Sequence, residues 1–219
     1  EERKQKTDQL LYSLPISMKK VVLGKYLAMI VLIAIPVLII ALYPLILSAY
    51  GNMNLAVAYG TLLAFFLLGA ALAAMGMFIS AMTESQPLAA GACFVVMLLN
   101  YFISGIADSV SATAIGSYLA LIVVVALFAV LVWLMTKSWI AAVASGGVLG
   151  VIVTVVFLVN SSAFEGLFPA IMRQMSLFER FYGFIGGVVD LTSFVYFLSV
   201  IAMFLFLTVQ SLEKRRWSE

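Results

Sequence analysis

The stretch Ala56–Met82, AVAYGTLLAFFLLGAALAAMGMFISAM, decides the fold class because it holds no charged residue over a length that can cross a membrane. The hydrocarbon core of a bilayer is about 30 Å thick, and an α-helix crosses it with about 20 apolar residues. Hydrophobic residues make up 65% of the chain and charged residues 10%. A soluble domain has about a quarter of its residues charged. The sequence therefore predicts an integral membrane protein.

Similar runs occur on both sides of this stretch. They are apolar all round instead of alternating, which argues against strands of a membrane barrel. We therefore predict an all-α, polytopic transmembrane helix bundle. The six expected spans cover about 26–49, 56–82, 87–104, 117–136, 139–159 and 192–209. Pro36 and Pro44 are expected to kink the first span or to end it early.

Small residues predict where helices approach each other closely. In the second span they are Gly69, Ala70, Ala73, Ala74, Gly76 and Ser80. In the fifth span they are Ala142, Gly146 and Gly150. We interpret both sets as packing faces before any substrate path.

The chain divides into four parts. Residues 1–25 are expected to form a cytoplasmic segment, and 26–160 to form five transmembrane helices. Residues 161–190 contain a predicted extracytoplasmic amphipathic helix over 164–182, in which apolar positions recur at helical spacing opposite charged ones. We expect this helix to lie on the membrane surface. Residues 191–219 hold the last span and a basic tail.

The basic residues set the expected orientation in the cell membrane. If residues 1–25 are cytoplasmic and every predicted span crosses, all Lys and Arg except Arg173 and Arg180 fall on the cytoplasmic side. This distribution follows the positive-inside rule, and the opposite orientation would reverse it. Both visible ends of the chain are then cytoplasmic. The chain begins with Glu1 instead of Met, and we expect residues upstream to be missing.

The first segment, Glu1–Lys25, is the longest water-compatible stretch of the chain. Its predicted first helix has an apolar side formed by Leu10, Leu11 and Leu14. Pro15 is expected to stop this helix, and Ser17 to cap a second helix that begins near Met18 and continues into the first span. A juxtamembrane helix bound to anionic lipid is the simplest interpretation. The helix-Pro-helix pattern is more typical of a docking elbow.

The sequence lacks residues that most enzymatic reactions require. The chain has no His and one Cys, Cys93, in an apolar run, which argues against metal sites and against Ser-His or Cys-His nucleophiles. Val22–Lys25 is not a phosphate-binding loop, because Lys19 and Tyr26 occupy positions that need Gly and Ser or Thr. The net charge of +2 gives no indication of a nucleic-acid partner.

The acidic residues are all expected in loops or at span ends, so no intramembrane relay is predicted. Asp108 and Asp190 are interpreted as solvated loop acids instead of ligands. Asn100 and Asn160 lie near the ends of predicted spans. For these two amides, helix capping or interhelical hydrogen bonding is favoured over substrate contact.

Several short motifs carry a resemblance to a known family. Glu2–Lys4, Thr7–Leu11, Leu14–Ser17 and Val22–Ala28 resemble the cytoplasmic coupling segment of ABC-2 type transporter permeases. The similarity is closest to the gliding-motility and nitrous-oxide-maturation branch. Further matches are Gly76–Ser80 with Thr83 and Glu84, Gly187–Leu191 with Tyr196 and Phe197, Phe204–Thr208 and Ser211–Trp217.

The chain departs from this family in three ways. Lys6 stands where the family usually has Gly before Thr7. The spans over 117–159 look like an extra hairpin. The family also has spans before the coupling segment, which implies a fragment of a protein with about eight spans.

The resemblance implies a transmembrane permease subunit of an ABC exporter that hydrolyses nothing itself. A separate cytoplasmic ABC ATPase subunit would hold the ATP and Mg²⁺, and a second permease copy or a paralogue would pair with this chain within membrane lipid. The implied ATPase-docking residues are Glu2, Arg3, Lys4, Thr7, Asp8, Leu10, Leu11, Leu14 and Pro15. The alternatives are an ATP-independent secondary transporter or channel and, with less support, an intramembrane enzyme.

Overall fold

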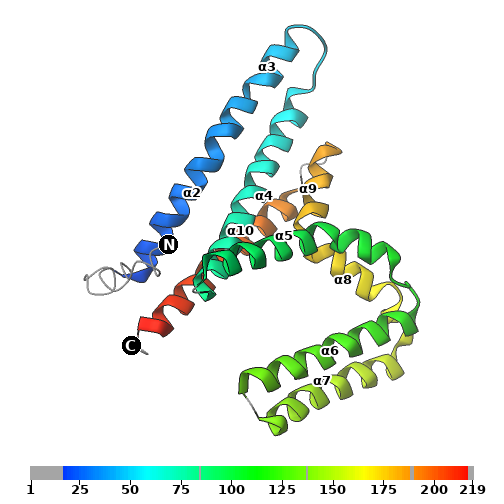
Figure 1. Ribbon diagram of the computed structural model, residues 1–219. Helices are drawn as coiled ribbons and strands as arrows, with labels where there is room; N and C mark the ends of the chain where they lie inside the picture. Colours follow the sequence, from blue (N-terminus) through cyan, green and yellow to red (C-terminus); the bar gives the residue numbers. More distant parts are fainter. Residues whose placement is uncertain (1–16, 84, 137, 188–189, 217–219) are drawn as a thin grey trace. The chain divides into compact units, whose positions relative to one another are not determined.

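The computed structural model describes residues 17–83, 85–136, 138–187 and 190–216, and every regular element in these ranges is helical (Figure 1). The elements are α2 (Met18–Ile40), α3 (Leu42–Ser48), α4 (Leu55–Met82), α5 (Gln86–Ser109), α6 (Ala114–Thr136), α7 (Trp139–Val159), the 3-10 helix η1 (Ser161–Phe164), α8 (Leu167–Met175), α9 (Leu177–Ile185) and α10 (Leu191–Arg216). Contacts divide the chain into two compact units. Unit 1 comprises residues 1–101 and 177–219, and unit 2 comprises residues 102–176.

Helix α4 is the centre of unit 1, where it contacts α2, α9 and α10. Its small residues let the neighbours approach: Ala64, Ala71 and Ala74 are fully buried. Larger side chains from the other helices fill the space around them. The buried core cluster consists of Ala64, Leu67, Leu68, Ala71, Leu177, Phe184 and Phe197. Of the residues predicted for a packing face on this span, Ala70 and Ala74 are buried and Gly69 lies against Ile33, whereas Ser80 is exposed, so the prediction is confirmed in part.

Two tyrosine hydroxyls fasten α2 to α4. The Tyr26 hydroxyl donates to the Ala70 carbonyl at 3.1 Å, and the Tyr59 hydroxyl donates to the Ala41 carbonyl at 3.0 Å. Ala41 lies at the break between α2 and α3, which confirms that the first predicted span is interrupted. Pro44 lies inside α3 and cannot donate the backbone hydrogen bond that a continuous helix requires.

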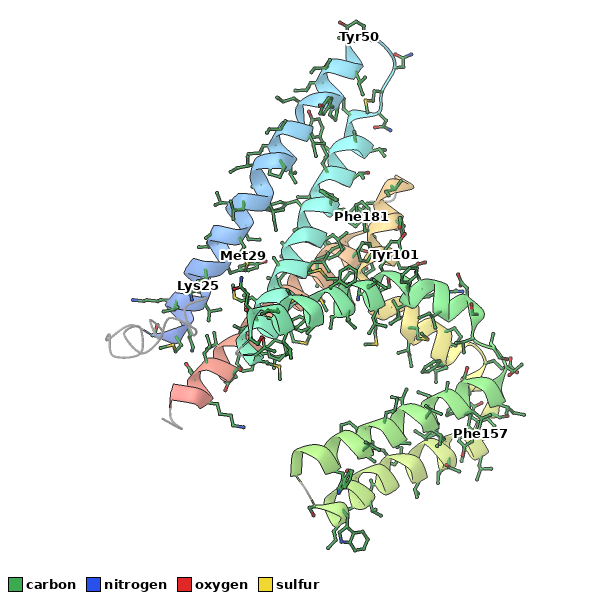
Figure 2. All side chains as sticks on the ribbon, in the orientation of Figure 1. Lys25, Met29, Tyr50, Tyr101, Phe157 and Phe181 are labelled. Atoms are coloured by element: carbon green, nitrogen blue, oxygen red, sulfur yellow. The ribbon has the colours of Figure 1, made fainter. Side chains whose placement is uncertain are left out.

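Unit 2 is built on the α6–α7 hairpin. A Cβ added at Gly146 would lie 2.6 Å from the Ala129 Cβ, so the two helices touch at this glycine. Nearer the other end, the Tyr118 and Thr154 hydroxyls are 3.1 Å apart, and the ring of Tyr118 stacks on Phe157 with centroids 4.5 Å apart (Figure 2). The prediction of close packing at Gly146 is confirmed.

Within the described residues, the span candidates number fewer than the six predicted. Four helical stretches are long and apolar enough to cross a membrane: Met18–Ser48, Leu55–Met82, Gln86–Ser109 and Leu191–Lys214. The bent pair Val143–Val159 and Ser161–Met175 gives a fifth if it counts as one span, and α6 contributes the shorter apolar stretch Ala114–Val130. The chain therefore has four or five span candidates by length and composition.

The connection between the predicted spans 87–104 and 117–136 is shorter than expected. Helix α5 continues to Ser109 and α6 begins at Ala114, so Asp108 lies in the last turn of a helix. The Ser109 hydroxyl donates to the Gly105 carbonyl, a bond made within the helix that lets a polar residue extend it.

Candidate functional site

The predicted ATPase-docking residues lie outside the part of the chain that the structure describes. These residues are Glu2, Arg3, Lys4, Thr7, Asp8, Leu10, Leu11, Leu14 and Pro15. The described chain starts at Ser17, directly after them. The described residues that follow this segment directly are those at the start of α2.

Helix α2 begins at Met18, as predicted. Ser17 is its N-cap in an extended conformation, but its side chain makes no capping bond, and the Ser17 carbonyl accepts from the Lys20 amide at 3.0 Å. Lys19, Lys20 and Lys25 are exposed. Figure 2 shows Lys25 near the start of α2. The base of α2 therefore places its charges outward, where lysine side chains meet water or lipid headgroups.

On the side of α2 that faces unit 1, the first turns of the helix carry a stripe of apolar residues. Met18, Val22 and Tyr26 recur every four residues, and Met18 and Val22 are only 2% exposed. Helix α2 contacts both α4 and α10. Buried residues near the end of α10 include Thr208 and Val209, and Figure 1 shows this end close to the start of α2. The start of α2 is therefore packed against two further helices of unit 1.

Sequence reasoning missed this stripe. Its spacing is present in the sequence, but the residues around it are apolar too, so α2 has almost no amphipathic contrast along its length. Side chains that face lipid and side chains that face protein are equally apolar in a membrane span. Only the position of α4 and α10 distinguishes them.

The single amphipathic helix predicted over 164–182 is wrong in its extent. The structure has η1, α8 and α9 in its place. Gly166 separates the first two with φ of 68°, a left-handed conformation that favours glycine. Ser176 is extended and separates α8 from α9. Helical spacing continued in register across these breaks, which is why the sequence pattern concealed them.

Helix α9 runs along the first half of α4. The rings of Phe181 and Phe65 are tilted, with centroids 6.1 Å apart, and the Thr61 hydroxyl donates to the Phe184 carbonyl at 3.2 Å. A Cβ added at Gly187, whose φ is 80°, would lie 3.4 Å from Val57. Since Phe181, Phe184 and Gly187 meet successively earlier turns of α4, α9 is antiparallel to a membrane-span candidate. The chain then reverses into α10.

Asn100 supports the start of α9. Its Oδ1 accepts a hydrogen bond from the Leu177 amide at 3.1 Å, which satisfies one of the free amides of a helix N-terminus. Beside it, the rings of Tyr101 and Phe178 meet edge to face at 5.2 Å (Figure 2). The prediction of capping or interhelical bonding by Asn100 is confirmed. Asn160 makes a local bond instead, accepting from the Ser162 hydroxyl at 2.7 Å.

Arg180 is the charged residue of α9 that faces α10. Its guanidinium carbon lies 4.2 Å from the centroid of the Tyr196 ring, a cation–π contact. Its Nε is buried and has no hydrogen-bond partner. The prediction placed Arg180 on a surface helix. The structure places it on a helix that packs along a span candidate, and the sequence carried no signal for this change of surroundings.

Asp190 lies just before α10 and caps it. Its Oδ1 accepts from the Thr192 amide at 3.0 Å, and its carbonyl accepts from the Phe194 amide at 3.3 Å. Hydrogen bonds from Thr192, together with the more distant charge of Arg180, lower the pKa of the Asp190 carboxyl. The carboxylate is thereby kept ionised, and the interpretation of Asp190 as a loop acid becomes more specific, since it is a helix cap.

Asp108 pairs with Arg173 inside unit 2. The carboxylate accepts from the Arg173 guanidinium, and both side chains are more than half exposed. Beside this pair, the Gly166 amide donates to the Ala112 carbonyl at 2.8 Å. Together these contacts hold the α5–α6 connection to the segment around α8. An exposed ion pair of this kind contributes little stability.

The described residues contain no group of three or more His, Cys, Asp or Glu side chains that could hold a metal ion. Cys93 is half-buried, and its thiol donates to the Gly76 carbonyl at 3.6 Å, which is a packing contact between α4 and α5. The described helices that pack around α4 in unit 1 are α2, α9 and α10.

Helices of this length and apolarity define a multi-pass membrane protein. Among known protein families, the chain matches the ABC-2 family transporter protein over residues 1–217, and it therefore belongs to that family. Members of this family are membrane components of ABC transporters and work with an ATPase subunit. Comparison with curated proteins and comparison with solved structures find no match.

Proposed function

We propose that this chain is the transmembrane permease of an ABC exporter and that a separate cytoplasmic ATPase docks on residues 2–15. The family match carries the proposal, because it includes this segment. ATP and Mg²⁺ would bind the ATPase subunit, and this chain would hydrolyse nothing. The permease would pair with a second copy or a paralogue in the lipid bilayer.

The coupling step follows from the packing of the α2 base. ATP binding brings the ATPase subunits together and moves the docked segment. Helix α2 follows without a break after Ser17, and its buried stripe lies against unit 1. The movement would therefore reach α4 and α10 and shift the bundle between two arrangements.

Leu10 and Leu11 test the docking role. Replacing both with Asp should abolish co-purification of the ATPase while leaving membrane insertion intact, because acidic groups cannot enter an apolar groove. Gln5→Asp is the matched control, since Gln5 lies on the opposite side of the predicted helix. Retained co-purification of the double variant, or equal loss in both, would contradict the proposal.

The proposed orientation has both visible ends of the chain in the cytoplasm. In a Cys93→Ala background, Ala112→Cys should react with a membrane-impermeant maleimide added outside cells. Lys6→Cys should react only after the membrane is opened. Labelling of position 6 from outside would overturn the orientation.

A further inference from the structure

The charge of Arg180, in unit 1, has no ion-pair partner among the described residues. Among the described residues, the ion pair within 4.0 Å is Arg173 with Asp108, and Arg180 takes no part in it. Glu179 is exposed on another side of α9, near Tyr182, and Asp190 uses Oδ1 to cap α10. The Tyr196 ring lies over the guanidinium. Within the described ranges of the chain, no carboxylate lies within ion-pair distance of the Arg180 charge.

The level of Arg180 along the spans makes this unusual. Its partner Tyr196 lies in the second turn of α10, and Phe65, the neighbour of Phe181, lies in the third turn of α4. Since α4 has 28 residues, it is about 42 Å long and matches a bilayer with its headgroups. Arg180 therefore lies about 8–15 Å from the ends of these helices. This is the level just below the lipid headgroups.

A guanidinium in this position has donors to offer. It carries five N–H groups in a plane. The Nε–H of Arg180 is buried, so an oxyanion would be bound by the two terminal amino groups, which a ring stacked on the face does not use. Phosphate accepts two such bonds side by side. A long Arg side chain at this depth also reaches toward the headgroup layer. A lipid phosphate meets both conditions, because it brings two acceptors and lies at that level.

We propose that the Arg180 guanidinium, held on the Tyr196 ring, binds the phosphate group of an anionic membrane lipid beside the α9–α10 hairpin. This inference does not depend on the ATPase or on the direction of transport. It gives the Arg180 charge an anionic partner that the described part of the chain does not supply. Binding would stabilise the folded protein, since the unfolded chain lacks the site.

The test is a thermal-unfolding titration of the purified chain in neutral detergent with short-chain phosphatidylglycerol. The wild type should show a rise in Tm that saturates. Arg180→Gln should move the midpoint of the titration about tenfold higher, because a charge-assisted contact is lost. Arg173→Gln is the matched control. It removes the same charge from an exposed ion pair and should leave the midpoint unchanged.

Two further measurements distinguish a lipid phosphate from free phosphate and compare two substitutions of Arg180. Inorganic phosphate at the same concentration should give no shift, and an equal shift would overturn the lipid assignment. Arg180→Lys keeps the charge without the fork and should raise the midpoint less than Arg180→Gln. If Arg180→Gln does not fold, Arg180→Lys carries the test. A wild-type midpoint in the available Arg180 variant would overturn the proposal, as would a midpoint raised equally in Arg173→Gln.

Discussion

Two helical hairpins of this protein pack in different ways. The α9–α10 hairpin of unit 1 places large side chains, among them Leu177, Phe184 and Phe197, into a shared core with α4. The α6–α7 hairpin of unit 2 meets at small residues, with Gly146 against Ala129. Large side chains need a third helix to enclose them, whereas small ones let two backbones meet directly. Residue size therefore determines which helices form a core and which meet directly at small residues. The contact of α6 with α7 at Ala129 and Gly146 is called the seam.

The largest expected effect comes from emptying the core of the first hairpin. Phe197 is fully buried, so Phe197→Ala should cost about 3–5 kcal/mol of unfolding free energy. Hydrogen exchange should rise in α4, α9 and α10. Phe206→Ala on the same helix is the control, because Phe206 is 60% exposed. Equal losses in both variants would refute the packing difference along α10.

Overfilling the seam of the second hairpin should have the next largest effect. Gly146→Ala places a Cβ 2.6 Å from that of Ala129, so the helices must separate, at a cost of about 1–3 kcal/mol. Gly147→Ala is the matched control, because nothing lies within 4 Å of its added Cβ. Exchange mass spectrometry should show loosening of α6 and α7 in the first variant alone. A silent Gly146→Ala would mean that the seam is not in contact.

The cap of α10 should contribute less, and in a pH-dependent way. The folded pKa of Asp190 is lowered, so its ionised form stabilises the fold above the unfolded pKa, and this contribution is lost as pH falls through the folded pKa. Asp190→Ala should lower Tm at pH 7. Asp190→Asn should retain the capping bond. Its Tm should also fall less as the pH drops from about 5 to about 3, because the ordinary pKa of an Asp carboxyl is about 3.9 and that of Asp190 lies below it. An unchanged acid profile would exclude a role for the charge.

The smallest effect is expected at the hydroxyl pair of the second hairpin. Tyr118→Phe removes the bond to Thr154 and should cost about 0.6 kcal/mol, as measured hydrogen bonds between membrane helices do on average. Tyr50→Phe, at a position 87% exposed, should cost nothing measurable. Thermal unfolding in detergent would show the difference. A loss as large as that of Gly146→Ala would mean that the polar contact, and not the seam, holds this hairpin.

The sequence predicted the helices well because charge and apolarity mark them directly. The start of α2 at Met18 and the ends of α7 at Trp139 and Val159 follow from Pro15, Ser138 and Asn160 at their borders. Which faces are buried could not be predicted. In α2, Val22 is buried and Leu23 is half exposed, and no physical property of either residue separates them before α4 is placed.

The candidate site was predictable only in part. The coupling segment stays a prediction from its motifs, because Pro15 and the leucines before it lie outside the described residues. The α9 packing depends on two backbone breaks, at Gly166 and Ser176, which hydrophobic periodicity does not register. The contact of Arg180 with the Tyr196 ring could therefore not be predicted from the sequence.

The two tyrosine hydroxyls between α2 and α4 have a mechanical consequence. Tyr26 and Ala41, the residues of α2 and its end that are fastened, lie about 22 Å apart along the helix. Two helices joined by hydrogen bonds at two points that far apart resist both sliding and rolling against each other. The two bonds therefore oppose sliding of α2 along α4 up to Ala41, where the helix is interrupted.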